Sequence, residues 1–363
     1  MSLTFLWTDI MVWLLVFSLI ALGYVVGRSP QVQKQWRAIF KSSIAMVSAI
    51  VLLVYVLFAL LDSVHFHKEN STQMVSLLDM AFEHRINNTE RTYSAPFATV
   101  EYAKSIVSED GISKQVNLPL KYVNNTSIMN ETLFALLVGL VLSIFLIGTH
   151  MLWQKRKAKP SEIPWNVAYI TISLLVMTFT WLYMLSFDYH VLGTDKVGGD
   201  VLYQSLKSIR TGVLIGILTT LVTLPLAIFL GISAGLFRGW VDDVIQYIYT
   251  TLNSIPSVLL IAAAVLLMQV VMDNNPQWFE TTQERSDIRL LFLVLILGIT
   301  SWTGLCRLLR AETLKISQIE FVTAAKAFGV GKMTIIRKHV LPNLMHIVLI
   351  AVVLDFSGLV LAE

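Results

Sequence analysis

Three residues with metal-binding side chains, His190, Asp195 and Asp200, lie close together in the stretch HVLGTDKVGGDV, residues 190–201. Imidazole nitrogens and carboxylate oxygens are common ligands of divalent metals in proteins. No second His or Cys accompanies them at a ligand spacing, so a metal site is the weaker interpretation. The stronger interpretation is structural, because Gly193 and Gly198 permit tight turns with positive φ and Asp200 suits the N-cap of a helix over 201–210.

Polar residues inside apolar segments are the second group of candidates, because a charge at the bilayer centre costs roughly 2.5–3.5 kcal/mol on insertion scales and usually faces protein or water. Asp355 lies about twelve residues into the apolar segment 344–361. It could line a polar pathway or make a hydrogen bond between helices or subunits, and the sequence leaves both open. Asn253 is a weaker pathway candidate, and Pro256 would free backbone carbonyls into a cavity by kinking its helix. His346 and Asp355 are nine residues apart, which is not the i, i+4 spacing of a helical metal pair, so catalysis is disfavoured.

The charged segment 320–342, EFVTAAKAFGVGKMTIIRKHVLP, lies between two apolar segments and predicts a helix–turn–helix at the membrane surface. Ala324 and Ala325 give the first helix a small face that another protein can approach closely. Gly329 fits the C′ position, where a left-handed residue ends a helix. A second short helix is expected over 333–339, and Pro342 begins the next membrane helix at the position that helices tolerate best. A plain basic connector needs none of these features, so the segment is interpreted as a contact for a partner protein.

The composition indicates an all-α polytopic membrane protein. The 363 residues are 55% hydrophobic and 14% charged, whereas soluble domains average about 45–50% and about 25%. The net charge of +3 does not argue for a nucleic-acid partner. A bilayer-spanning helix needs about 20 apolar residues, and we expect about eight such helices. They lie near Ile10–Gly27, Ile39–Leu61, Leu133–Trp153, Trp165–Phe187, Gly212–Leu236, Val244–Met272, Leu290–Leu309 and Leu344–Leu361.

Lys and Arg gather in the loops after the first, third and seventh of these segments. The positive-inside rule therefore places these loops in the cytoplasm and the N-terminus outside. The segment 62–131 then lies outside. Its apolar residues are too sparse to predict a fold, and the sequons at Asn70, Asn124 and Asn130 are attributed to chance. The basic, Pro-containing linker 154–163 predicts a boundary between an N-terminal extension, residues 1–164, and a second domain, residues 165–363.

Three motifs in this order resemble the inner-membrane permeases of ABC importers, in particular the dipeptide, oligopeptide and nickel permease family. Of that family's motif H-P-L-G-T-D-x-x-G-R-D-V, the chain retains His190, Gly193, Thr194, Asp195, Gly198 and Asp200. A proline-bearing motif of the F-P-S-L-L type is similar to IPSVL at 255–259. The family's ATPase-contacting motif, E-A-A-x-x-x-G followed by I-x-L-P, aligns with Thr323, Ala324, Ala325, Gly329, His339, Leu341 and Pro342.

The resemblance covers residues from about 165 to 363 and implies a permease that catalyses no reaction itself. Cytoplasmic ABC ATPase subunits would use the ATP, a second permease subunit would complete a heterodimer, and an external binding protein would deliver the substrate. The resemblance implies peptides as substrates, with nickel or another small solute as the alternative, and a bacterial inner-membrane location. The residues expected to couple the chain to the ATPase are Glu320, Thr323, Ala324, Ala325, Lys326, Gly329, Leu341 and Pro342.

The chain departs from the family pattern at Thr323, Gly199 and His339, which stand where the motifs have Glu, Arg and Ile. The lost Glu removes a polar contact, while the residues that shape the loop remain. The family continues beyond the position of Glu363 through a final helix, so the chain is expected to be C-terminally incomplete. A membrane sensor that binds its ligand through 62–131 is the alternative from another class. It is disfavoured because no long soluble segment is found on the cytoplasmic side.

Overall fold

The structure of the chain is a computed structural model that describes residues 2–4, 6–28, 33, 36, 38–67, 74–109, 112–124, 127–156, 164–278 and 282–362. It divides into two compact units, Met1–Phe5 with Asp9–Arg210 and Leu6–Thr8 with Thr211–Glu363. The helix α8 (Val201–Phe237) begins in the first unit and continues into the second. The domain boundary near residue 164, predicted from the basic, Pro-containing linker 154–163, stays a prediction.

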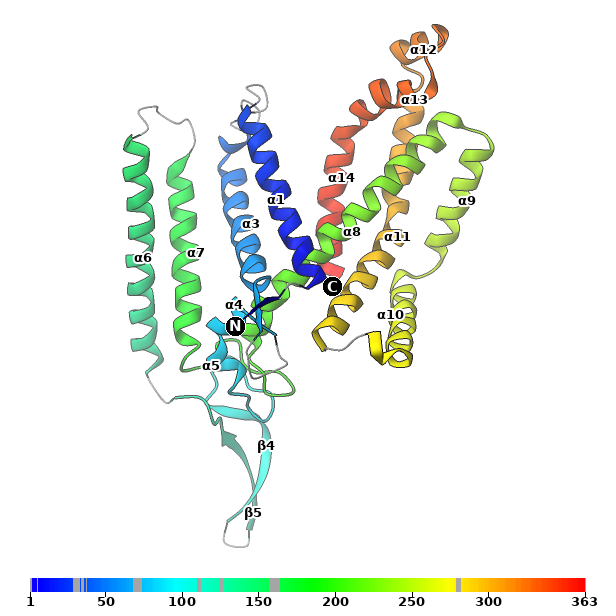
Figure 1. Cartoon of the computed structure of the whole chain (residues 1–363). Helices are drawn as coiled ribbons and strands as arrows, with labels where there is room; N and C mark the ends of the chain where they lie inside the picture. Colours follow the sequence, from blue (N-terminus) through cyan, green and yellow to red (C-terminus); the bar gives the residue numbers. More distant parts are fainter. Residues whose placement is uncertain are drawn as a thin grey trace. The chain divides into compact units, whose positions relative to one another are not determined.

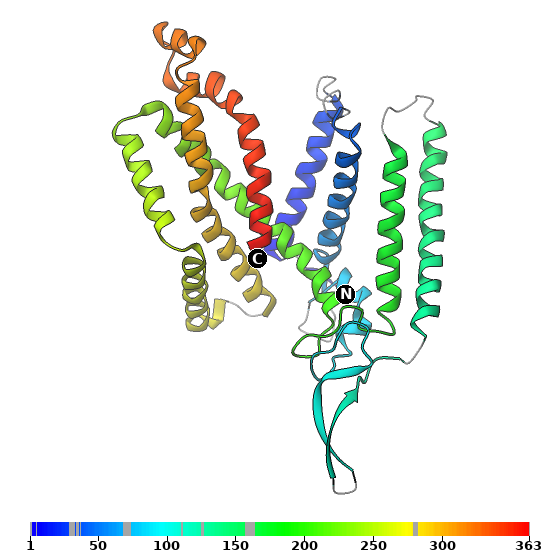
Figure 2. The same cartoon turned by 180° about the vertical axis from the view of Figure 1, so that it is seen from behind.

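Long apolar helices make up most of the first unit, and they are α1 (Trp7–Arg28), α3 (Ser43–Asp62), α6 (Ile128–Arg156) and α7 (Trp165–Leu185). Helices α6 and α7 run side by side (Figures 1 and 2). Their backbones approach closely at Gly139, where an added Cβ would lie 2.9 Å from the Cα of Met177. The rings of Phe58 and Phe179, 4.9 Å apart, pack α3 against α7.

The segment 62–131, for which the sequence predicts no fold, forms a small α/β subdomain in its described residues. Its elements are β2 (His65–His67), β3 (Met74–Ser76), α4 (Leu77–Ala81), α5 (Glu83–Ile86), β4 (Val100–Glu109) and β5 (Ile112–Pro119). Strand β1 (Ser2–Thr4) joins β2 and β3 in an antiparallel sheet of order β1-β2-β3, and β4 and β5 form an antiparallel hairpin. Figure 1 shows the hairpin projecting from this unit on the side opposite to the C-terminal end of α6 and the N-terminal end of α7.

The second unit is a helical bundle built on the C-terminal part of α8. Its further elements are α9 (Trp240–Ser254), α10 (Ser257–Asn274), η1 (Pro276–Trp278), α11 (Thr282–Ile316), α12 (Glu320–Ala327), α13 (Lys332–Ile335), the π-helix η2 (Ile336–Val340) and α14 (Leu341–Ala362). Small residues on α8 let α11 approach, since a Cβ on Gly231 would lie 2.8 Å from the carbonyl oxygen of Cys306. Such close contact is typical of helix packing in membranes.

The predicted fold class, an all-α polytopic membrane protein, is confirmed. In the described part of the chain, six helices are long and apolar enough to cross a bilayer, and a seventh crossing is possible if α9 and α10 together make one span. All eight predicted segments are helical, including α1 with 22 residues. The prediction of one continuous helix over 244–272 is wrong, because α9 and α10 meet at an angle of 82°. Pro256 disfavours the helical conformation of Ile255, which is extended with ψ of 124°, and the helix breaks there.

Candidate coupling segment and membrane cavities

The turn at Gly329 ends α12 in the way that the sequence predicts. Gly329 has φ of +76°. Its N–H donates to the carbonyl of Lys326 at 3.0 Å, and the N–H of Val330 donates to the carbonyl of Ala325 at 3.0 Å. These two bonds form a Schellman motif, which satisfies carbonyls that the helix end would otherwise leave without partners. The residues 320–342 will be called the coupling segment.

The coupling segment is held to the bundle by its own apolar side chains. Val322, Ile335 and Val340 are fully buried and join the same hydrophobic cluster as Leu309 of α11 and Leu344 of α14. The Nζ of Lys326 also donates to the carbonyl of Ser317, 3.3 Å away at the end of α11. A force on the segment can therefore reach α11 and α14 through packed side chains.

The outer face of the segment exposes large apolar side chains at the tip of the second unit. Phe328 is 87% exposed, Met333 68% and Phe321 43%. Figure 1 shows α12 and α13 beyond the ends of α11 and α14. Of the two alanines predicted to form a small contact face, Ala324 is exposed, while Ala325 is half-buried against the core. The sequence pattern predicts the small residues of this surface but not Phe328 or Met333.

The second half of the segment corrects one structural prediction. Instead of a separate short helix over 333–339, α13, the π-helix η2 and α14 follow one another without interruption. Pro342 therefore lies just inside a continuous helix, where it lacks an N–H and its ring crowds the carbonyl four residues earlier. The wider π-turn directly before it gives the backbone a different hydrogen-bonding pattern at that point.

Asp355 lines a cavity within the second unit. The cavity has a volume of about 250 Å³, and the hydroxyl-bearing residues Thr220, Thr223 and Ser301 share its wall with Asp355. The other two predicted pathway residues lie elsewhere. Asn253 accepts a hydrogen bond from Thr303 at 2.9 Å and so links α9 to α11.

The third of these residues, Pro256, stands at the break between α9 and α10. That break leaves the two helices at 82° rather than merely kinking one helix. It is also the point where the segment similar to the family's proline-bearing motif begins.

The signature residues after α7 hold the small subdomain to α7 and α8. His190 is fully buried, and its Nδ1 lies 2.7 Å from the Asp200 carboxylate, which also accepts the N–H of Tyr203 at 3.0 Å as a helix N-cap. Thr194 donates to the carbonyl of Thr92 at 2.8 Å. The backbone N–H of Glu90 donates to the carbonyl of Gly198 at 2.9 Å.

The signature glycines are required by close backbone contact. A Cβ on Gly193, which has φ of +79°, would lie 2.3 Å from the Ser94 carbonyl oxygen, and one on Gly198 would lie 1.8 Å from that of Glu90. Asp195 closes its own turn by accepting the N–H of Gly199 at 2.7 Å. The side-chain amide of Gln204 donates to Asp195 at 2.6 Å, and this bond is the main reason that the pKa of Asp195 falls below its ordinary value.

The metal interpretation receives no support from this geometry. His190 meets Asp200, but Asp195 bonds to its own turn and to Gln204 instead. Among the described residues, no group of three His, Cys, Asp or Glu side chains is arranged to hold a metal ion. The contacts of His190, Thr194 and Asp200 in the described part of the chain are those of residues that hold the fold together.

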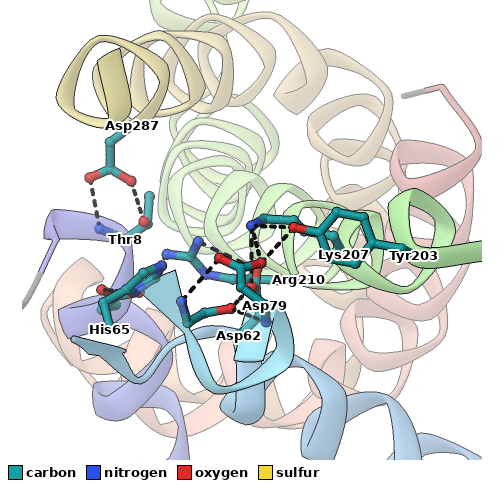
Figure 3. A network of polar contacts seen from close by, with 10 residues as sticks. Thr8, Asp62, His65, Asp79, Tyr203, Lys207, Arg210 and Asp287 are labelled. Carbon is teal, nitrogen blue, oxygen red and sulfur yellow. Dashed lines mark hydrogen bonds and ion pairs between the residues drawn. The ribbon is translucent and has the colours of Figure 1, made fainter. Parts of the chain in front are cut away.

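A buried charge network, which the sequence analysis missed, ties the first unit together (Figure 3). Arg210 donates to Asp9 at 2.5 Å and lies 3.7 Å from Asp62, while Lys207 donates to Asp79 at 2.6 Å. The Nδ1 of His65 lies 2.9 Å from Asp9. A sequence signal was available, because Lys207 and Arg210 are three residues apart on one helix and Asp9 and Asp62 flank apolar segments. In the second unit, the Asp287 carboxylate accepts the N–H of Thr8 at 3.1 Å.

Comparison with known proteins finds a domain match that contains the coupling segment and the α11 and α14 residues that line the cavities. Residues 227–363 match the family described as binding-protein-dependent transport system inner membrane component. The chain is 30% identical over 174 residues to the oligopeptide transport system permease protein OppC of Mycobacterium bovis, covering 48% of this chain and 54% of the relative. It is 28% identical to the dipeptide transport system permease protein DppC of Bacillus subtilis, covering 48% and 49%. It is 30% identical to the glutathione transport system permease protein GsiD of Pectobacterium atrosepticum, covering 42% and 45%.

Residues 227–363 are therefore similar to the inner-membrane component of binding-protein-dependent transport systems. The named relatives are permease proteins of oligopeptide, dipeptide and glutathione transport systems, and the apolar helices of this chain fit a multi-pass membrane protein. The chain spans about half the length of the curated relatives it matches.

Proposed function

We propose that the chain is the permease subunit of an ATP-driven importer of peptides. The observation that carries the proposal is the coupling segment, which lies inside the matched permease domain and presents exposed apolar side chains on a rigidly packed base. Large exposed apolar side chains on a charged surface segment are typical of protein interaction sites. The partner would be a cytoplasmic ABC ATPase, which would hydrolyse the ATP; the chain itself would bind no cofactor.

The proposed mechanism is mechanical. Closure of the ATPase would move α12, and the buried contacts of Val322, Ile335 and Val340 would carry that movement to α11 and α14. Packed interfaces of this kind switch between discrete arrangements rather than deforming continuously, which suits a pathway that opens to one side at a time. Each arrangement must bind nucleotide or peptide differently for the cycle to proceed in one direction.

The orientation follows from the basic loops and the coupling segment. The coupling segment would face the cytoplasm of a bacterium, with the chain in the inner membrane and its N-terminus outside. Within the first unit, the C-terminal end of α6 and the β4–β5 hairpin lie at opposite ends, which agrees with a hairpin outside the membrane (Figure 1). A second permease subunit and an external binding protein would complete the transporter, while the bilayer surrounds its helices.

The test is ATP-dependent uptake by the complete transporter, reconstituted in vesicles with its binding protein, partner permease and ATPase. We expect uptake of a radiolabelled tetra-alanine peptide that requires ATP hydrolysis and every subunit. Nickel uptake, measured under the same conditions, tests the alternative substrate. Uptake of nickel without uptake of peptide, or peptide uptake that persists without this chain, would contradict the proposal.

A further inference from the structure

Two neighbouring cavities in the second unit carry opposite charges. The first is the cavity of about 250 Å³ that contains Asp355. The second, of about 480 Å³, contains Arg289 and is lined by residues of α8, α10, α11 and α14. Leu359 of α14 lines both, so the two cavities adjoin. The larger cavity lies within the range found for small-molecule sites, roughly 300–1,000 Å³, and the smaller lies just below it.

Neither charge is neutralised by another described residue. Asp355 makes no hydrogen bond or ion pair with the described part of the chain. Arg289 donates to the neutral side chain of Gln269, and no described carboxylate lies within ion-pair distance of it. Unpaired charges inside membrane helices are costly and usually face water or a ligand. Both side chains are exposed, so a molecule inside the cavities can reach them.

The two cavities follow one another along the length of the helices that line them. Arg289 lies near the start of α11, whereas Ser301, which lines the Asp355 cavity, lies deeper in the same helix. On α8 the corresponding residues are Thr211 and Thr220. Their separation of nine residues corresponds to roughly 14 Å along the helix axis. That length is about four residues of extended peptide.

We propose that the two cavities form a site that binds a short peptide by its opposite charges, with Asp355 on an ammonium group and Arg289 on a carboxylate. This inference rests on the proposed function and adds the chemistry that the pathway recognises. A guanidinium suits a carboxylate because it can donate two parallel hydrogen bonds. The apolar wall of the larger cavity, including Ile215, Ile261 and Leu293, would accommodate uncharged side chains of the peptide.

The ammonium has two possible sources, the peptide N-terminus and a lysine side chain. We would measure ATP-dependent uptake of tetra-alanine and of the same peptide with one lysine, using wild type, Asp355→Asn and Asp355→Glu. Each rate is divided by the wild-type rate for that peptide, which cancels differences in delivery by the binding protein. Asp355→Asn should lower uptake about tenfold, the factor that corresponds to 1.4 kcal/mol, and Asp355→Glu should restore most of it. An equal loss for both peptides identifies the N-terminus, and a loss confined to the lysine peptide identifies the side chain.

The interaction of Arg289 with a carboxylate is tested in the same way. The variants are Arg289→Gln and the charge-preserving Arg289→Lys, and a glutamate-containing peptide replaces the lysine peptide. Asp243→Asn is the matched control, because Asp243 is an exposed acid on α9 that lines neither cavity. Wild-type uptake by Asp355→Asn and Arg289→Gln, or losses that the charge-preserving variants do not restore, would overturn the proposal. A wild-type transporter that carries no peptide would refute the proposed function, and this inference with it.

Discussion

Substitution of Gly329 by alanine should loosen the end of α12 without a steric clash. Nothing lies within 4 Å of a Cβ built at this position, so the cost is that of the backbone conformation alone, with φ of +76°. A left-handed conformation costs an ordinary L-residue roughly 1–2 kcal/mol. This corresponds to a factor of about 5–30 in the local opening equilibrium.

The backbone N–H of Val330 is the probe, because its bond to the Ala325 carbonyl exists only while the turn is closed. Hydrogen exchange of the purified chain in detergent, followed by mass spectrometry of peptides covering the coupling segment, should show protection of this amide reduced about 5–30-fold. The Asn variant should lie between wild type and Gly329→Ala, since asparagine tolerates the left-handed region better.

Gly331→Ala is the matched control for this experiment. Gly331 also has open space around its Cβ position, but its φ is −61° and its ψ is 144°, which alanine adopts readily. Its exchange should stay within about twofold of wild type, because exposed substitutions that strain nothing usually change stability by about 0.5 kcal/mol or less. Equal loss of protection in both alanine variants, or unchanged protection in Gly329→Ala, would refute the reasoning.

Two further predictions concern contacts away from the turn. Partial burial lowers the pKa of His84, so the folded subdomain binds a proton less readily than the unfolded chain and should lose stability as the pH falls through about 6.5. Limited proteolysis at pH 7.5 and 5.5 should show this loss of stability. The variant His84→Phe keeps the ring stacking on Phe187 and should lose less stability at pH 5.5. An unchanged pH dependence in this variant would contradict the assignment to His84. Arg310→Gln breaks the paired bonds of 2.5 and 2.6 Å to Asp242 and should lower the free energy of unfolding by about 1–3 kcal/mol. Thermal unfolding in detergent measures the change in stability. The control Lys315→Gln removes an exposed ion pair and should destabilise the chain much less. Equal destabilisation by both variants would argue against the α9–α11 link.

The membrane helices could be predicted from the sequence because bilayer thickness fixes their length and composition. The turn at Gly329 could be predicted because a local backbone rule decides it. The break at Pro256 was only partly predictable. A proline in a membrane helix can either kink or break it, and neighbouring contacts decide which.

The small subdomain could not be predicted because long-range contacts stabilise it. Glu90 lies about a hundred residues before His190, and the glycines at 193 and 198 are required by backbone segments about a hundred residues earlier. The charge network has the same character. Asp9 and Arg210 are 201 residues apart, and no local pattern pairs them.

The exposed surface of the coupling segment was partly predictable. The small residues Ala324 and Ala325 stand out in the sequence, whereas Phe328 and Met333 look like ordinary core residues until the structure shows their exposure. The charged cavities were least accessible to prediction. Asp355 stands out as an acid in an apolar segment, but only the three-dimensional arrangement brings Arg289 into an adjoining cavity.

The central claim, that the coupling segment binds an ATPase, is tested most directly by affinity purification of the tagged chain from native membranes in mild detergent. Phe328→Asp is the critical variant, because Phe328 is 87% exposed and a charge there should leave the fold intact. Phe328→Leu keeps the apolar surface. The account predicts that an ABC ATPase copurifies with wild type and Phe328→Leu and is lost with Phe328→Asp. An ATPase that remains with Phe328→Asp, or that is absent from wild type, would contradict it.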